Sequence, residues 1–433
     1  MQAFQNAPVE IWQNIIHHVL YDPIAFLDDP YYPGCNLHTA YNEWTDGKRL
    51  CKLEAQRGTL RLVSRSWKVL ADLHQWRYFQ PVRCKDMSQQ LEWALSTRRL
   101  DFYCLCSGGG RVRESRVSDA FHTCPRHKES WISQYQRENP ELCSATFDLA
   151  TIVHIQDSLE LDFAIQDTPI KNFFPRLRAL SVGEYNAPQK HLLGVSTTLT
   201  FFSIRLVPEH YKERYEKPLK FPVLRTLHVE VDEEQNFDSL IQWKMPLLAH
   251  AELTVPSVEQ YDLRATFFKH IGKNLVRLSL RTYEKSHLHP ERYWEWMPKL
   301  EYISVTRLTL KWGFYPLPPD YPLRTFGLVE ESVPNVAWSR RNTGTIAEKW
   351  KTISTIADCH SWEDLTKWLK VTFPDKPPDL DKLTKGYEHE HRGVHCWECI
   401  HLLLWKCKKN GLRYEDITGR TWAEYFHAKG VRL

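Results

Sequence analysis

The stretches PVEIWQNIIHHVL (residues 8–20) and TLRLVSRSWKVLAD (residues 59–72) decide how the N-terminal part of this chain folds. In the first stretch, two rows of apolar side chains recur every four residues, and the polar side chains lie opposite them. In the second, apolar side chains again share one helical face. Pro8 suits a first helical turn, where its missing N–H costs nothing. Both stretches therefore predict amphipathic helices, and their periodicity alone supports a small helical bundle.

Composition and charge exclude several classes of protein. The 433 residues contain 57 Lys and Arg against 53 Asp and Glu, and the net charge of +4 is spread thinly along the chain. We therefore expect neither nucleic acid nor a membrane as a partner. The 11 Cys are scattered and odd in number, which is typical of reduced thiols. With no leader pattern and no apolar run of about 18 residues, we expect an intracellular protein, cytoplasmic or nuclear.

A repeated pattern dominates the middle of the chain. Leu-x-x-Leu-x-Leu, with substitutions, recurs at spacings of 22 to 27 residues, which is the period of leucine-rich repeats. In such repeats each unit contributes one short strand, and the units stack because none can bury its apolar face alone. We predict an irregular leucine-rich-repeat-like solenoid over residues 81–332, with an ordinary α/β sheet as the alternative. The matches begin at Leu177, Leu199, Leu224, Leu248, Leu275, Leu300 and Leu323.

The side chains that flank the inner leucines alternate onto one open face of the predicted strands. We predict that this face binds a protein substrate, because exposed aromatic and arginine side chains are frequent binding hot spots. The alternative is that these side chains merely solvate the sheet, and that charges such as Arg205 and Glu230 pair with each other. The candidate substrate-binding residues are Phe201, His228, His250, Arg277, Arg281 and Tyr302.

Beyond residue 333 the strand pattern gives way to helical spacing, which predicts a helical cap over residues 333–433. Within it, HEHRGVHCWECIH (residues 389–401) carries the ligand types of a zinc site, as does an irregular Cys/His group at residues 104–127. Cys396 and Cys399 also share a helical face with apolar residues, so we interpret them as core residues and predict no metal. No motif of an enzyme active site occurs, and we predict no catalytic residue and no cofactor.

One known family combines the N-terminal features. Pro8-x-Glu10-Ile11, an apolar helix, Leu62-Val63-Ser64-Arg65-x-Trp67 and Trp76-Arg77 follow one another in an order that resembles the F-box. The resemblance covers residues 1–80, with an insertion at 22–57 that opens as a turn-rich loop, as in expanded F-box families of mushroom-forming fungi. Ala7 stands where the family usually has Leu, and Ser64 where it often has Cys. An unrelated helical hairpin with a core Trp is the alternative.

The resemblance implies a function without catalysis. F-box proteins are substrate-recognition subunits of SCF-type E3 ubiquitin ligases: the F-box binds the Skp adaptor, and through it the cullin, while another domain binds a target. Proximity then raises the effective concentration of the target near the ubiquitin-charged enzyme. The alternatives are an F-box scaffold outside ubiquitination and a zinc-binding protein that uses the C-terminal Cys/His cluster. The implied adaptor-binding residues are Pro8, Ile11, Trp12, Ile15, Ile16, Leu62, Val63 and Trp67.

Overall fold

The chain is a mixed α/β protein whose contacts divide it into two compact units. The first unit comprises residues 1–35, 40–232 and 242–247, and the second unit comprises residues 36–39, 233–241 and 248–433. The computed structural model of the chain describes residues 8–20, 22, 24–31, 37–72, 78–79, 97–102, 148–155, 170–185, 190–206, 218–231, 237–255, 261–282, 293–306, 318, 320–329, 354–357, 414–416 and 420–428.

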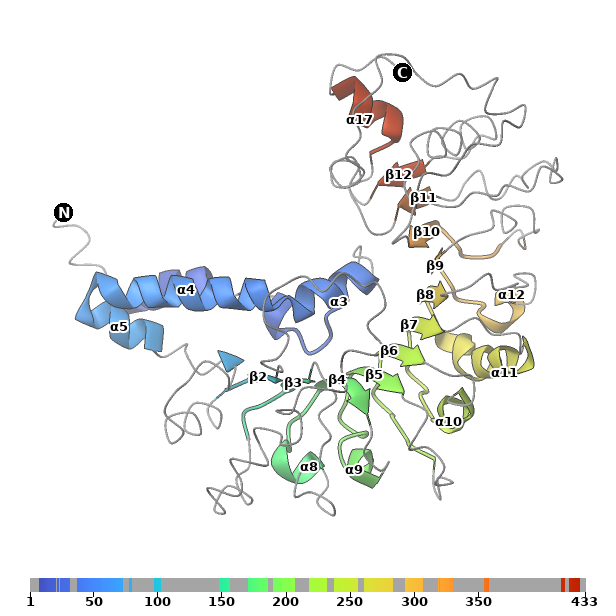
Figure 1. Cartoon of the computed structure of the whole chain (residues 1–433), viewed down its shortest axis with the longest axis horizontal. Helices are drawn as coiled ribbons and strands as arrows, with labels where there is room; N and C mark the ends of the chain where they lie inside the picture. Colours follow the sequence, from blue (N-terminus) through green and yellow to red (C-terminus); the bar gives the residue numbers. More distant parts are fainter. Residues whose placement is uncertain are drawn as a thin grey trace, which may run out of the picture. The chain divides into compact units, whose positions relative to one another are not determined.

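Three helices of the first unit form what we name the hairpin: α2 (Val9–Leu20), α4 (Gly47–Val63) and α5 (Arg65–Asp72). Helices α4 and α5 run side by side in opposite directions (Figure 1). The sequence predicted one continuous helix over residues 59–72, but the helix breaks at Ser64. The reason is local, because the Ser64 hydroxyl accepts a hydrogen bond from the Trp67 N–H (3.1 Å) and so caps the start of α5. The amphipathic helix predicted over residues 8–20 is confirmed.

The helix that the spacing of Leu50 and Leu53 predicts over residues 47–56 of the insertion is confirmed, and the part expected to be a turn-rich loop contains further helices. The insertion contains the 3-10 helix η1 (Ile24–Phe26), the helix α3 (Leu37–Thr45) and the first half of α4. Leu50 of α4 packs with Ala25 and Phe26 in a small apolar cluster. The long helix α4 therefore begins in the insertion and ends in the hairpin.

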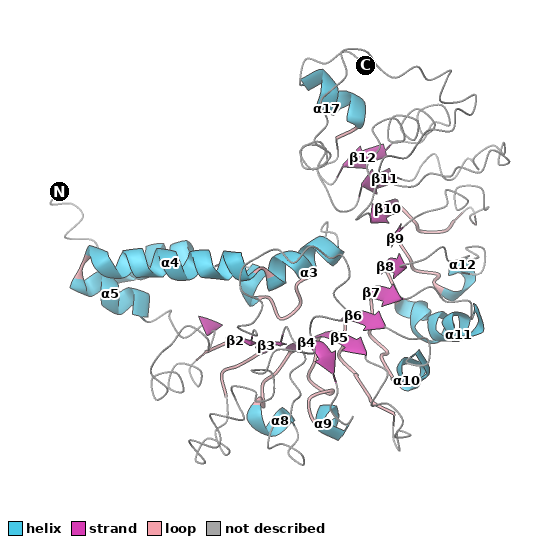
Figure 2. Cartoon of the chain, in the orientation of Figure 1, coloured by secondary structure: helices cyan, strands magenta, loops and turns pink. Residues whose placement is uncertain are grey.

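The first unit also holds six strands, each of which pairs in parallel with the next along the chain (Figure 2). Both faces of these strands are covered, as is usual for parallel sheets. On one face Phe202 packs against Phe221 and Trp243, and on the other Phe201 packs with residues of the insertion. The short helices α8 (Ile170–Phe173) and α9 (Lys190–Leu193) lie between strands in the sequence. The strands are β1 (Tyr78–Phe79), β2 (Arg99–Phe102), β3 (Ile152–Ile155), β4 (Ala179–Tyr185), β5 (Phe201–Leu206) and β6 (Thr226–Val231).

The second unit contains a parallel run of the same kind, from β7 to β12. Gly272 lies where the η9 turn meets the end of α12, since a Cβ there would stand 2.6 Å from the Trp296 carbonyl oxygen. The elements with residues in this unit are α10 (Phe237–Gln242), β7 (His250–Val255), α11 (Tyr261–Ile271), η9 (Gly272–Asn274), β8 (Arg277–Thr282), α12 (Tyr293–Trp296), β9 (Tyr302–Thr306), β10 (Thr325–Val329), β11 (Ser354–Ala357), β12 (Tyr414–Asp416) and α17 (Trp422–Ala428).

The repeat pattern located the strands well. Each of its seven matches falls on one of the strands β4 to β10, so the prediction of one strand per repeat is confirmed. The prediction of a purely helical segment after residue 333 is wrong at β11 and β12, which add to the parallel run. The physical reason is that β10 would otherwise present an unpaired edge: β11 pairs with β10, and β12 in turn pairs with β11.

Candidate functional site

The structure sorts the adaptor-binding candidates into core and surface residues. Ile16 is fully buried in the hairpin, where it packs with Leu20, Leu70 and Ala71. The rings of Trp12 and Trp67 lie 5.3 Å apart and pack against the same cluster. These three candidates hold the helices together, which removes most of their surface from any partner. The exposed candidates are Pro8, Ile11, Ile15, Leu62 and Val63.

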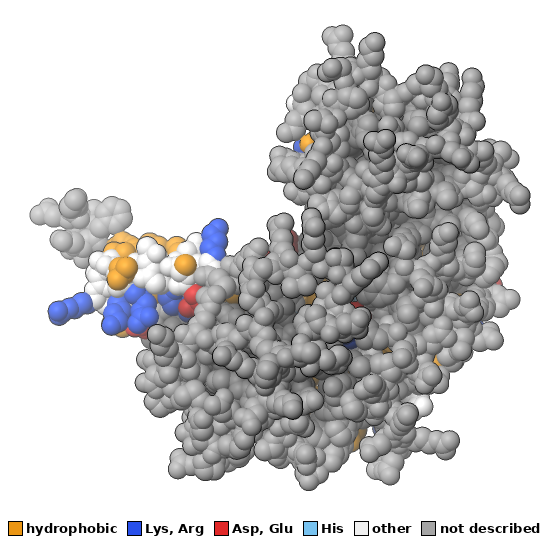
Figure 3. All heavy atoms as spheres, in the orientation of Figure 1, with side chains coloured by type: hydrophobic (Ala, Val, Ile, Leu, Met, Phe, Trp, Pro, Cys, Tyr) orange, Lys and Arg blue, Asp and Glu red, His pale blue; other side chains and the backbone are white. Residues whose placement is uncertain are grey.

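The exposed apolar residues of the hairpin define a surface that we name the apolar face. Its first part is a row of side chains four residues apart on α2, beside the buried row that contains Ile16. Its second part lies where α4 turns into α5, and Leu62 there is 87% exposed. Figure 3 shows apolar side chains along one edge of the hairpin helices. The sequence predicts Val19 in the same apolar row as Ile11 and Ile15, but neither Val19 nor Val69 was among the adaptor-binding candidates. The apolar face consists of Ile11, Ile15, Val19, Leu62, Val63 and Val69, and it leaves out the exposed Val9 in the first turn of α2.

Ion pairs inside the hairpin fix its helices but leave the apolar face free. Arg57 is buried and binds Glu54 (2.5 Å), and burial lowers the pKa of this guanidinium while the carboxylate opposes the shift. Arg61 binds Asp72 across the turn between α4 and α5 (2.9 Å). Both carboxylates of α4 and α5 are thereby engaged within the hairpin.

The insertion covers one face of the strands in the first unit. We name its residues 22, 24–31 and 40–50 the clasp. Trp44 is fully buried against Ile152, Ala179 and Phe201, and its ring lies 5.1 Å from that of Phe201. The Trp44 indole N–H donates to the Leu27 carbonyl oxygen (3.3 Å), which also ties the two parts of the clasp together.

Tyr41 of the clasp lies over the polar row of the same face. Its hydroxyl is within hydrogen-bond distance of Ser181 (3.0 Å) and Ser203 (3.1 Å), and Ser203 in turn contacts His228 Nδ1 (2.8 Å). The rings of Tyr41 and His228 are 4.3 Å apart. Three neighbouring strands thus contribute polar atoms that one tyrosine of the insertion covers.

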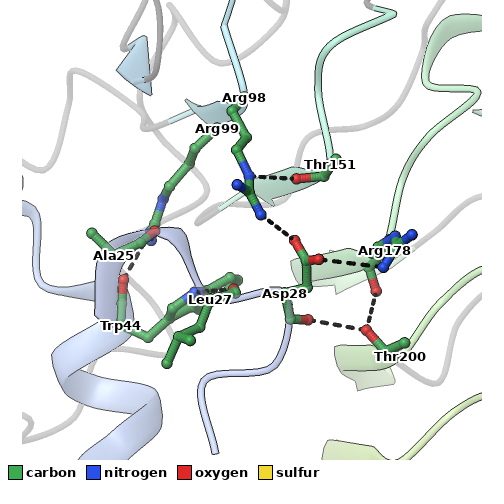
Figure 4. Close-up of polar contacts among 9 residues, drawn as sticks. All are labelled: Ala25, Leu27, Asp28, Trp44, Arg98, Arg99, Thr151, Arg178 and Thr200. Atoms are coloured by element: carbon green, nitrogen blue, oxygen red, sulfur yellow. Dashed lines mark hydrogen bonds and ion pairs between the residues drawn. The ribbon is translucent and has the colours of Figure 1, made fainter. Parts of the chain in front are cut away.

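A buried arginine joins the clasp to strand β2. Arg99 is fully buried, pairs with Asp101 (2.8 Å) and donates to the carbonyl oxygens of Ala25 (2.6 Å) and Trp44 (2.8 Å), as Figure 4 shows for the two carbonyls. Its guanidinium also lies 4.6 Å from the centre of the Trp44 ring. A buried charge pair of this kind costs little only when its remaining donors are used, and here they are used by the clasp backbone.

Acidic residues of the clasp contact the rim of the strands. Asp28 pairs with Arg98 (3.3 Å) and Arg178 (3.7 Å), and its carbonyl oxygen accepts from Thr200 (3.2 Å) (Figure 4). Asp29 accepts a hydrogen bond from Thr226 (2.7 Å). Burial raises the pKa of Asp29 to about 6, although the bond from Thr226 opposes the shift. The clasp is therefore bonded to β2, β4, β5 and β6 or to the residues just before them, and Trp44 packs on β3.

These contacts change the interpretation of the predicted substrate face. Phe201 was expected to be exposed, but it is 1% exposed because Trp44 and Tyr41 cover it. His228 is half-buried beneath Tyr41. In the first unit this face is thus occupied by the chain's own insertion. Arg205 and Glu230 lie 3.8 Å apart, in agreement with the alternative that neighbouring charges pair.

The remaining substrate candidates lie in the second unit. Tyr302 was expected to be exposed, but it is 4% exposed, and the Arg277 guanidinium lies 4.2 Å from the centre of its ring. Arg281 pairs with the buried Glu252 (3.1 Å). His250, Arg277 and Arg281 are all half-buried.

Comparisons with known proteins do not identify a family for the chain. No family model, curated protein or solved structure matches the chain. Across the described ranges, no helix combines the length and apolar character that crossing a membrane requires. The described residues also contain no group of three His, Cys, Asp or Glu side chains placed to hold a metal ion. Both Cys/His groups singled out in the sequence lie outside the described residues.

Proposed function

We propose that this protein is a substrate-recognition subunit of an SCF-type ubiquitin ligase, which binds a Skp adaptor through the apolar face of the hairpin. One observation carries the proposal. An exposed apolar row on α2 runs beside a packed inner row that includes Ile16, and Leu62 and Val63 at the turn between α4 and α5 are exposed as well. The hairpin needs only the inner row to fold, so the outer row is available to a partner.

The size of the apolar face suits a protein partner. Full burial of a large aliphatic side chain contributes about 1.5 to 3 kcal/mol, so burial of the six residues of the apolar face offsets a large part of the cost of association, which is about 4 to 15 kcal/mol. The order of motifs in the sequence supports the assignment of this partner as the Skp adaptor, which in turn recruits the cullin. The protein itself supplies no catalytic group and no cofactor.

The parallel strands serve, in this proposal, as a leucine-rich-repeat-like solenoid that binds the target protein. Strands that recur every 22 to 27 residues and pair in sequence order support this interpretation. Because the clasp occupies the face of β4 to β6, we place the target on the second unit, near His250 and Arg277. This assignment replaces Phe201 and His228 as contact residues.

Adaptor binding tests the proposal directly. We expect Ile15→Asp with Leu62→Asp to weaken binding of a purified Skp adaptor at least a hundredfold, because two charges would be desolvated in an apolar interface. Both residues are exposed, so the hairpin should stay folded, which circular dichroism checks. Leu149→Asp, an exposed leucine on the strand-bearing part of the first unit, is the matched control.

Unchanged adaptor affinity in the folded double variant would exclude this function. Ubiquitination of captured partners in the reconstituted complex then separates the ligase subunit from an F-box scaffold. A scaffold would bind the same adaptor, but it would recruit no cullin and would transfer no ubiquitin to its partner.

A further inference from the structure

The hairpin has a charge distribution that its apolar face does not explain. Between residues 47 and 72 the chain has seven basic side chains against the two acidic ones, Glu54 and Asp72, whereas the chain as a whole is nearly neutral. Helix α2 adds one further acidic residue, Glu10. The basic side chains are Lys48, Arg49, Lys52, Arg57, Arg61, Arg65 and Lys68.

Internal ion pairs account for only some of these charges. Arg57 and Arg61 face Glu54 and Asp72, as described above. Arg49 pairs with Asp22 and Glu43 of the insertion. Within the described part of the chain, Lys52, Arg65 and Lys68 are exposed and form no ion pair, so folding of the hairpin does not use their charge.

Two of these cations adjoin the apolar face. Arg65 and Val69 are four residues apart on α5 and so are neighbours on its surface, and Lys68, three residues from Arg65, lies beside Arg65. The space-filling view shows apolar side chains along one edge of the hairpin and Lys and Arg side chains along the other edge of the same visible surface (Figure 3). A partner that covers this surface would meet both.

We propose that Arg65 and Lys68 form a basic rim that selects an adaptor whose apolar groove is bordered by carboxylates. This inference rests on the proposed function and adds the chemistry of the partner. An acidic protein surface satisfies both parts of the hairpin, since carboxylates pair with the rim while an apolar groove receives Ile15 and Leu62. A nucleic acid would use the rim alone and leave the apolar row exposed to water.

The rim acts mainly on the rate of association. Charges at the edge of an interface steer the encounter and remain partly hydrated, whereas the apolar centre controls dissociation. At physiological ionic strength the Debye length is about 8 Å, so steering by exposed charges weakens strongly as salt is added. We therefore expect the association rate constant of the parent protein to fall about tenfold between 50 and 500 mM NaCl.

Charge reversal separates the rim from the apolar face. In Arg65→Glu with Lys68→Glu, the association rate constant for the purified Skp adaptor at 50 mM NaCl should fall at least tenfold and lose its salt dependence. The dissociation rate constant should change less than threefold. Arg176→Glu with Lys220→Glu, two exposed basic residues on the strand-bearing part of the first unit, makes the same change in net charge and should behave like the parent.

Each outcome supports or overturns a separate statement. If Ile15→Asp with Leu62→Asp abolishes binding but the rim variant keeps the parent's association rate and salt dependence, the rim proposal is wrong and the proposed function stands. If neither variant affects the adaptor, both fail. If the rim variant loses affinity only for single-stranded RNA or for vesicles with anionic lipid, which are assayed in parallel, the rim binds polyanions and the acidic-adaptor proposal is overturned.

Discussion

At the scale of single residues, burial between the clasp and the strands shifts the pKa of two side chains, Asp29 of the clasp and His154 of β3. Burial raises the pKa of Asp29 to about 6, and the hydrogen bonds from Thr226 and the Tyr31 N–H and the charge of Arg225 only partly offset it. Burial lowers the pKa of His154 to about 4. His154 is 4% exposed, and its ring lies 5.9 Å from that of Trp44. The two groups therefore give the stability of the first unit opposite dependences on pH.

The sign for Asp29 follows from linkage. Its folded-state pKa lies above the ordinary value of 3.8, so the folded state retains a proton between pH 4 and 6 that the unfolded state has lost. The contribution of Asp29 to the free energy of unfolding is greatest below pH 4 and falls as the pH rises to 6. His154 is neutral in the folded state, so its contribution to the free energy of unfolding is greatest above pH 6.5 and falls as the pH drops towards 4.

Asp29→Asn isolates the carboxyl group, because His154 is the same in both proteins. We expect the variant to gain about 1 to 2 kcal/mol relative to the parent between pH 4 and pH 7, a value reduced from the full shift because Asp29 is partly exposed. Urea unfolding of both proteins at several pH values measures this difference. A difference that is flat with pH would show that the Asp29 carboxyl is solvated rather than buried.

At the scale of elements, the clasp is the feature that the sequence did not predict. Helical spacing in the hairpin and the Leu-x-x-Leu-x-Leu repeats were sufficient to locate α2, α5 and seven strands, because local periodicity encodes which face of an element is buried. Tyr41 and Trp44 also stand at helical spacing, but their partners lie far away in the sequence, and Tyr41 meets Ser181 across 140 positions. Such contacts leave no local pattern.

The clasp is held chiefly by Trp44, whereas Tyr41 adds polar contacts. We expect Trp44→Ala to lower the free energy of unfolding by about 3 to 5 kcal/mol, the usual cost of removing a buried aromatic side chain. Tyr41→Phe removes only a hydroxyl, and its expected cost is about 1 kcal/mol. Equilibrium denaturation of the two variants measures both values. If Trp44→Ala lowers the free energy of unfolding as little as Tyr41→Phe does, the strands are stable without the clasp packed on them, and the clasp is not part of the core.

At the scale of the whole molecule, the hairpin and β1 to β6 belong to one compact unit, although the sequence suggested an N-terminal domain that ends near residue 80. Helix α4 explains why. Its first turns are fixed in the clasp, where Leu50 is buried and Arg49 pairs with Asp22. Its last turns carry Leu60 into the hairpin core. The insertion thus connects the helices of the hairpin to the strands.

Because α4 connects the clasp to the hairpin, we predict that a substitution that destabilises the clasp also destabilises the hairpin. Trp44 makes none of its described contacts with α2 or α5, yet Trp44→Ala should speed hydrogen exchange of buried amides in both helices. A loss of about 3 kcal/mol corresponds to more than a hundredfold faster exchange if the unit opens cooperatively. Leu149→Ala, a change at an exposed site of the same unit, should leave exchange unchanged. If α2 and α5 keep their protection while β4 to β6 lose theirs, the hairpin folds independently and is a separable module.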